Sequence, residues 1–135
     1  MRSDSGQGPV SHHRQADYMS DPSAYMSDPS AVFLVHAAIA RLVGDDPLAP
    51  IILAAVASEH PESFAANAAL ALVVESPQEV LSRARQFAAG RRDRQHLAVV
   101  EVFLSGDTAR AHLLSREHLA EFPDDLIVSW ITTRM

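Results

Sequence analysis

Two segments of this chain have Gly, Asp, Ala and Pro at the same spacing, and this recurrence constrains the fold more than any other feature of the sequence. In residues 44–61 and again in residues 106–123, a Gly-Asp pair opens the segment and an Ala follows five positions after the Gly. In both segments a Pro stands seventeen positions after the Gly. Because Gly and Pro both interrupt helices, the recurrence predicts a repeated helical hairpin, with a small residue at the inner turn and Pro at the outer turn.

The rest of the chain from residue 32 onward also reads as helix. Apolar residues recur at spacings of three and four, and Gly, Pro, Ser and Asp mark the breaks. Asp46 and Ser76 are predicted to cap helices, and Gly44 and Gly90 to end them. No segment shows strand alternation, so we expect an all-α fold with about seven helices, at residues 32–43, 47–59, 62–75, 77–89, 91–105, 107–121 and 124–134.

These helices are expected to form antiparallel hairpins that stack into a right-handed α-solenoid. A single hairpin cannot bury its apolar faces, so each repeat covers its neighbour. The middle unit, residues 62–90, is shorter than the others and has Ser76-Pro77 in place of Gly-Asp.

Composition excludes several classes of protein. The net charge of -6 opposes non-specific binding to nucleic acid, and the lack of Cys excludes a disulfide framework and a Cys-based zinc site. No apolar run approaches the roughly 20 residues that span a bilayer, and residues 31–40 lack the positive flank of a signal peptide, so we expect a cytoplasmic protein with no membrane partner. All 11 basic residues are Arg, which indicates a bacterial genome rich in GC.

Residues 1–30 are predicted to be a disordered tail that precedes a helical-repeat domain at residues 31–135. The tail is rich in Ser, Asp, Pro and Gly and has too few aliphatic side chains to offset the entropy of ordering. It contains two consecutive copies of Tyr-Met-Ser-Asp-Pro-Ser-Ala, from Tyr18 and from Tyr25. A tandem duplication or an over-extended start explains the copies better than a pair of docking motifs. Asp28 is expected to cap a helix that begins at Pro29.

The residues at the turns of these hairpins, and their spacing, resemble those of the tetratricopeptide repeat. The matching residues are Gly44, Ala49 and Pro61 in one unit and Gly106, Ala111, Leu119 and Pro123 in another. Two positions depart from that pattern, because Ser115 replaces a bulky aromatic residue and His118 replaces a small one.

Residues 94–101, followed by Gly106-Asp107, Leu119, Pro123 and Asp125-Leu126, are more specifically similar to the tetratricopeptide repeat protein 38-like family. The likeness covers residues 45–133 and implies an α-solenoid without transferable catalytic residues. Members of that family are several times longer, so the chain is expected to be a short relative or a truncated piece.

The seven His residues are not predicted to form a metal site. His112 and His118 are six positions apart, which places them on different faces of one helix, and no pair of His at i and i+4 has a nearby carboxylate. His96 and His118 are instead expected to be hydrogen-bonded structural residues. No nucleophile elbow or Gly-rich phosphate loop is present, so we predict neither catalysis nor a cofactor. Five Arg residues cluster at positions 83, 85, 91, 92 and 94. We expect them to be solvated side chains at a helix end, in preference to a site that binds an anion.

The sequence therefore predicts a protein-interaction scaffold. Its concave face would consist of the first helix of each hairpin, at residues 32–43, 62–75 and 91–105. The predicted partner contacts on that face are Asn67, Glu75, Arg94, Gln95 and Glu101. The last helix is apolar almost all round, so Ile127, Trp130 and Ile131 are predicted to pack into the final hairpin or to form a docking or homodimer patch.

Two alternatives stay open. One is a small helical ligand-binding protein or enzyme, in which two or more of His36, His96 and His112 converge with a carboxylate in a closed pocket. The other is a vestigial relative with no activity of its own.

Overall fold

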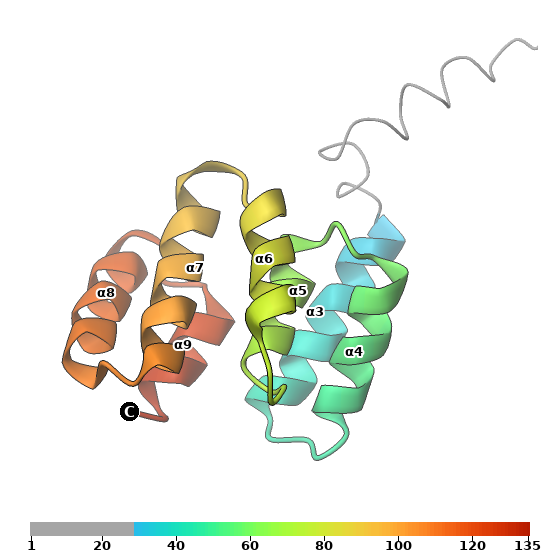
Figure 1. The fold of residues 1–135 in the computed structure, drawn as a ribbon, viewed down its shortest axis with the longest axis horizontal. Helices are drawn as coiled ribbons and strands as arrows, with labels where there is room; N and C mark the ends of the chain where they lie inside the picture. The colour runs from blue at the N-terminus through green and yellow to red at the C-terminus, as the bar shows by residue number, and fades with distance from the viewer. Residues whose placement is uncertain (1–28) are drawn as a thin grey trace, which may run out of the picture. The chain divides into compact units, whose positions relative to one another are not determined.

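The computed structural model describes residues 29–135. Residues 1–28, with Asp28, most of the predicted tail and most of the duplicated heptapeptide, lie outside the described residues. The predicted start of a helix at Pro29 is confirmed, and the last three residues of the second heptapeptide copy belong to that helix. Contacts divide the chain into two units, residues 1–32 and 33–135, and the pocket and the buried polar cluster lie within the second. The described residues form seven α-helices and no strand, which confirms the all-α prediction (Figure 1). The helices are α3 (Pro29–Val43), α4 (Ala49–Glu59), α5 (Phe64–Ala71), α6 (Gln78–Phe87), α7 (Gly90–Ser105), α8 (Thr108–Glu121) and α9 (Leu126–Thr132).

The Gly-Asp pair at residues 106–107 has the predicted function at a hairpin turn. Gly106 ends α7 with φ 88°, in the left-handed region where a side chain would be strained. Asp107 then caps α8, because its carboxylate accepts a hydrogen bond from the amide of Arg110 at 3.2 Å. The first residue of the pair turns the chain and the second starts the next helix.

The pair at residues 44–45 works differently, although its sequence is the same. Here Asp45, and not Gly44, has the positive φ, at 59°. Asp46 accepts the amide of Leu48 at 2.9 Å, and α4 begins only at Ala49. The helix therefore starts two residues later than Pro47, where the sequence placed its first turn.

Two predicted helix ends around α6 are wrong. Pro77 occupies the N-cap position and no side chain caps α6, so the predicted Ser76 capping box does not form. At the other end α6 stops at Phe87, and Ala88 and Ala89 are extended. Gly90, with φ 79°, turns the chain into α7 and belongs to that helix instead of ending α6.

The core is built around α5, whose composition explains its burial. Ser63 caps the helix by accepting the amide of Ala66 at 3.1 Å. Four alanines of α5, at positions 66, 68, 69 and 71, are fully buried. Their small side chains let α4, α6 and α7 all pack against this short helix. Apolar residues of α3 join the same core, among them Val35 and Leu42.

From α4 onward each helix contacts the next one along the chain. The pairs in contact are α4–α5, α5–α6, α6–α7, α7–α8 and α8–α9. Contacts also join α5 to α7 and α7 to α9 (Figure 1). These alternate helices therefore pack together, which brings residues of α5, α7 and α9 close to one another.

The last helix packs into the core. Ile127, Val128 and Ile131 are at most 2% exposed, while Leu126 is 54% exposed and Trp130 is half-buried. The helix contacts α7 and α8, as in the first of the two arrangements predicted for it. Among the described residues, no helix has the length and apolar character needed to cross a membrane.

Candidate functional site

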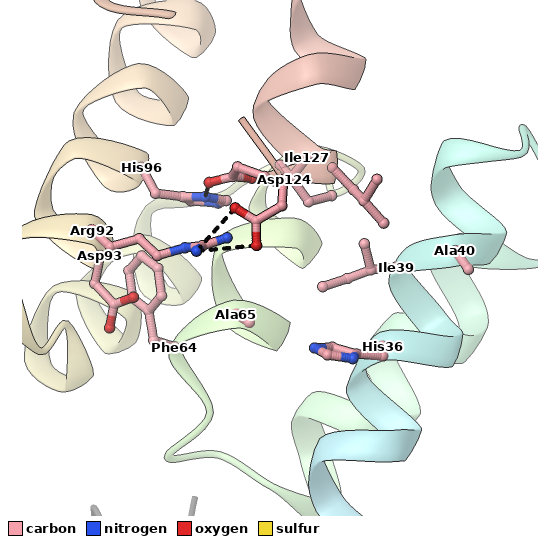
Figure 2. Close-up of a pocket in the computed structure, with 12 residues that line it drawn as sticks. His36, Ile39, Ala40, Phe64, Ala65, Arg92, Asp93, His96, Asp124 and Ile127 are labelled. Carbon is pink, nitrogen blue, oxygen red and sulfur yellow. Dashed lines mark hydrogen bonds and ion pairs between the residues drawn. The ribbon is translucent and has the colours of Figure 1, made fainter. Parts of the chain in front are cut away.

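A pocket of about 660 Å³ lies where α3, α5, α7 and the start of α9 come together (Figure 2). Three of these helices are the first helices of the predicted hairpins. The lining residues are His36, Ile39 and Ala40 of α3, Phe64 and Ala65 of α5, Arg92, Asp93 and His96 of α7, and Asp124, Asp125, Leu126 and Ile127 at the start of α9.

The pocket combines an apolar wall with charged groups. Ile39, Phe64 and Leu126 supply apolar surface. Arg92 forms an ion pair with Asp124 at 3.2 Å, and its guanidinium lies 5.3 Å from the ring centroid of Phe122. Figure 2 shows this ion pair between α7 and the start of α9, with His36 on the opposite side of the pocket. Such a surface suits a ligand that has both an apolar and a polar part.

Beside this pocket three buried polar residues form what we call the His–Asp–His cluster: His96, His118 and Asp125. Asp125 Oδ2 lies 2.7 Å from His96 Nδ1 and 2.7 Å from His118 Nε2. The three residues are 8%, 1% and 5% exposed, respectively. The cluster joins α7, α8 and the cap of α9, so it fixes the end of the described chain around one carboxylate oxygen.

Local structure positions each member of the cluster. Asp125 is the N-cap of α9, and its other oxygen, Oδ1, accepts the amide of Val128 at 3.2 Å. His118 Nδ1 lies 2.9 Å from Gln95 Oε1. Gln95 is oriented in turn by Glu121, to which it donates from Nε2 at 3.3 Å. The amide oxygen of Gln95 therefore faces His118, which makes Nδ1 the donor in that contact.

The surroundings of Asp125 favour its charged form. Burial alone would raise its pKa, but the hydrogen bond and positive charge of His96 oppose that effect. Hydrogen bonds from His118 and from the amide of Val128 act in the same direction. Together they hold the pKa of the Asp125 carboxyl well below its usual range. Asp125 is therefore a buried carboxylate, stabilised by its donors.

The prediction that His96 and His118 are hydrogen-bonded is confirmed. The spacing of His residues along single helices does not reveal their shared partner, Asp125. The two His residues belong to different helices of one hairpin, and Asp125 precedes a third helix. His112, the other His of α8, is exposed and takes no part in the cluster. One signal in the sequence does point to this cluster. Asp125 stands at the N-cap of the helix that follows the two helices with His96 and His118.

Three of the residues predicted to contact a partner are buried. Asn67 and Ile131 are 0% exposed and Ile127 is 2% exposed. Asn67 donates to the carbonyl oxygens of Pro61 and Ser63, and it accepts from Arg83 Nε at 3.2 Å. It therefore supports the turn before α5, and a polar residue on a first helix need not face the groove. Burial removes Asn67 and Ile131 from any exposed contact surface and leaves Ile127 only as part of the pocket wall.

The remaining predicted contacts do not meet at one surface. Glu75 and Glu101 line a second hollow of about 460 Å³, where Glu101 pairs with Arg85 at 2.8 Å. Arg94 is exposed, and Gln95 lies between α7 and α8 through its bonds to His118 and Glu121. Trp130 is half-buried, with the guanidinium of Arg134 lying 4.6 Å from its ring centroid.

Four arginines of the cluster at positions 83–94 have partners within the chain. Arg85 pairs with Glu101, Arg91 with Glu121 at 3.0 Å, and Arg92 with Asp124. Arg83 donates to Asn67. These contacts favour a structural role for the cluster over an anion site.

The chain was compared with family models, with curated proteins and with solved structures, and it matches none of them.

Proposed function

We propose that this chain is a tetratricopeptide-like interaction module that binds a peptide segment of another protein in the pocket at α3, α5, α7 and α9. One observation carries the proposal. Among the described residues, the pocket takes its lining from the first helices and from the start of α9, and none of it from α4, α6 or α8.

Stacked hairpins account for this distribution. When hairpins stack in a solenoid, their first helices lie side by side on the inner face and their second helices lie outside. The contacts of α5 with α7 and of α7 with α9 fit that arrangement. We therefore include the right-handed α-solenoid, the likeness to the tetratricopeptide repeat protein 38-like family and a cytoplasmic site of action in this proposal.

The charges at the pocket indicate which peptides would bind. Three carboxylates, of Asp93, Asp124 and Asp125, and one guanidinium, of Arg92, line the pocket. Ile39 and Leu126 add apolar surface beside them. Since complementary charge directs association, the preferred peptide would carry an apolar side chain next to a Lys or Arg.

Panning a random peptide library against the folded chain tests this function. Enriched peptides are expected to combine apolar and basic residues. Their affinity is expected to fall at least about tenfold in His36→Trp, because an indole at this exposed position obstructs the pocket. His112→Trp makes the same change at an exposed His of α8 outside the pocket and should bind as the parent does. No enrichment, or equal binding by both variants, would contradict the proposal.

A second candidate, binding of a small ligand, has one observation in its favour. His36 and His96 line the same pocket together with three carboxylates. His112, the third His of that alternative, lies elsewhere. Saturation-transfer NMR with a small-molecule library distinguishes the two functions. Ligands that bind the parent but not His36→Trp, in the absence of any enriched peptide, would favour the small-ligand function.

Pairing of two chains through α9 also belongs to the proposal. The available surface is Leu126, at 54% exposed, with half-buried Trp130. Light scattering at micromolar concentration is expected to show a dimer that Leu126→Asp converts to a monomer. Leu48→Asp, at a residue that is also 54% exposed, is the matched control and should leave the dimer intact. A parent chain that is monomeric throughout would remove this part of the proposal.

A further inference from the structure

We propose that His96, His118 and Asp125 form a binding site for one divalent first-row transition-metal ion, with Zn²⁺ as the representative. This inference does not depend on the proposed peptide-binding function. It rests on the geometry of the His–Asp–His cluster, on the groups that orient it and on its position beside the pocket.

The three potential ligand atoms already converge. One atom from each residue lies within 4.8 Å of the other two, and all three residues are buried. Asp125 Oδ2 is 2.7 Å from each of the two facing His nitrogens. In tetrahedral coordination, two ligands at about 2.1 Å from an ion are about 3.4 Å apart. Each contact between Asp125 Oδ2 and a His nitrogen would therefore need to widen by about 0.7 Å for the cluster to hold an ion.

The orientation of His118 calls for a cation at this place. Its Nδ1 faces the amide oxygen of Gln95 and carries the hydrogen of that contact. In a neutral imidazole the other nitrogen, Nε2, then has only a lone pair, and this lone pair points at the carboxylate oxygen Oδ2 of Asp125. Two electron-rich atoms 2.7 Å apart need a cation between them. A metal ion bound between these two atoms would meet this requirement.

The partners that His118 and Asp125 have outside the cluster are those that metal ligands in proteins have. A ligating His commonly donates its other ring N–H to a carbonyl or carboxylate oxygen, as His118 does to Gln95. The ligating carboxylate is commonly held by a further hydrogen bond, as Asp125 is through Oδ1 and Val128. That bond occupies Oδ1 and leaves Oδ2 as the atom directed at both imidazoles.

The donor set selects the class of ion. Two imidazole nitrogens and one carboxylate oxygen suit Zn²⁺ and its first-row neighbours, whereas Mg²⁺ and Ca²⁺ prefer sites made of oxygen alone. Three protein ligands also leave at least one coordination position for water or another ligand. Because His96 and Asp125 line the pocket, a ligand of that kind would approach from the pocket.

Metal titration of the full chain, first treated with a chelator, tests the site. Calorimetry with Zn²⁺ is expected to show one cluster-dependent site per chain, and Co²⁺ should give visible absorption typical of His and carboxylate ligation. Asp125→Asn and His118→Gln are each expected to weaken Zn²⁺ binding at least 100-fold. Gln95→Leu removes no ligand and is expected to weaken binding about 10–100-fold, as changes to groups that orient a ligand do.

Matched controls separate this site from other histidines. His36→Gln and His112→Gln alter exposed His residues and should leave the affinity unchanged. A chain with His12→Ala and His13→Ala should keep the same site. Circular dichroism in excess chelator shows whether each variant is folded. If Asp125→Asn and His118→Gln are unfolded, the Zn²⁺ affinity of Gln95→Leu tests the site in their place.

Absence of Zn²⁺ binding by the parent chain would overturn the inference. So would binding that survives both Asp125→Asn and Gln95→Leu in folded protein. Peptide binding is measured separately in excess chelator, so failure of the metal site and failure of the proposed function give different results.

Discussion

Asp125→Ala is expected to lower the free energy of unfolding by about 3–5 kcal/mol, which is the usual cost of removing one partner from a buried ionic contact. This cost arises because the substitution leaves His96 and His118 buried without their common acceptor. Loss of the cap of α9 acts in the same direction. Asp125 thus combines three stabilising roles in one side chain.

Asp107→Ala provides a matched control for this prediction. Asp107 caps α8 with the same geometry, accepting a backbone amide at 3.2 Å, but it is exposed and has no imidazole partner in the described structure. Its removal should cost only the cap, about 1 kcal/mol. Urea unfolding in excess chelator measures both variants without any contribution from bound metal. Equal destabilisation by the two substitutions would mean that the His–Asp–His cluster adds nothing to stability.

The stability difference should also depend on pH. Because the pKa of Asp125 is lowered in the folded state, its charge stabilises the fold at pH values above the usual carboxyl range, near about 3.9. That contribution is lost as the pH falls through the lowered folded-state pKa. The gap between the parent and Asp125→Asn should therefore be constant at neutral pH and narrow in strong acid. A gap that widens in acid would contradict the assignment.

Ile131→Ala is the second substitution with a large expected effect. Ile131 is fully buried in α9 and belongs to the core cluster, so its truncation should cost about 2–5 kcal/mol. Leu126→Ala, on the same helix at a residue that is 54% exposed, should change stability by no more than about 0.5 kcal/mol. Thermal and urea unfolding of the two variants compares them directly. Similar small effects would mean that α9 is not packed as described.

The helices could largely be predicted from the sequence, because they depend on local information. Gly106-Asp107 is an example, since a left-handed Gly and a capping Asp each act within one turn. At residues 44–45, Gly44 ends α3 as predicted, but α4 begins at Ala49 and not at Pro47, because Pro47 and Pro50 follow the turn. Neither Pro has a backbone N–H, so neither can donate a helical hydrogen bond. The helix therefore begins only at Ala49, where Pro50 falls in the first turn. The prediction that Gly90 ends a helix is wrong because its positive φ lies at the start of α7.

The candidate site could not be predicted in the same way, because its parts come from three helices. His96 and His118 are 22 positions apart, and only the packing of α7 against α8 brings them to one carboxylate. Periodicity indicates which residues share a face of one helix, but not which faces meet. The same limit explains Asn67 and Ile131, which were expected at a partner surface and are buried instead.

The central claim is that the first helices and α9 share one binding surface for a peptide. Amide chemical-shift mapping tests it most directly, using ¹⁵N-labelled chain and a peptide enriched from the library. Peptide binding is expected to shift the amides around His36, Phe64, Arg92 and Leu126, which belong to α3, α5, α7 and α9. Shifts confined to α4, α6 and α8 would place the binding surface on the second helices and contradict it.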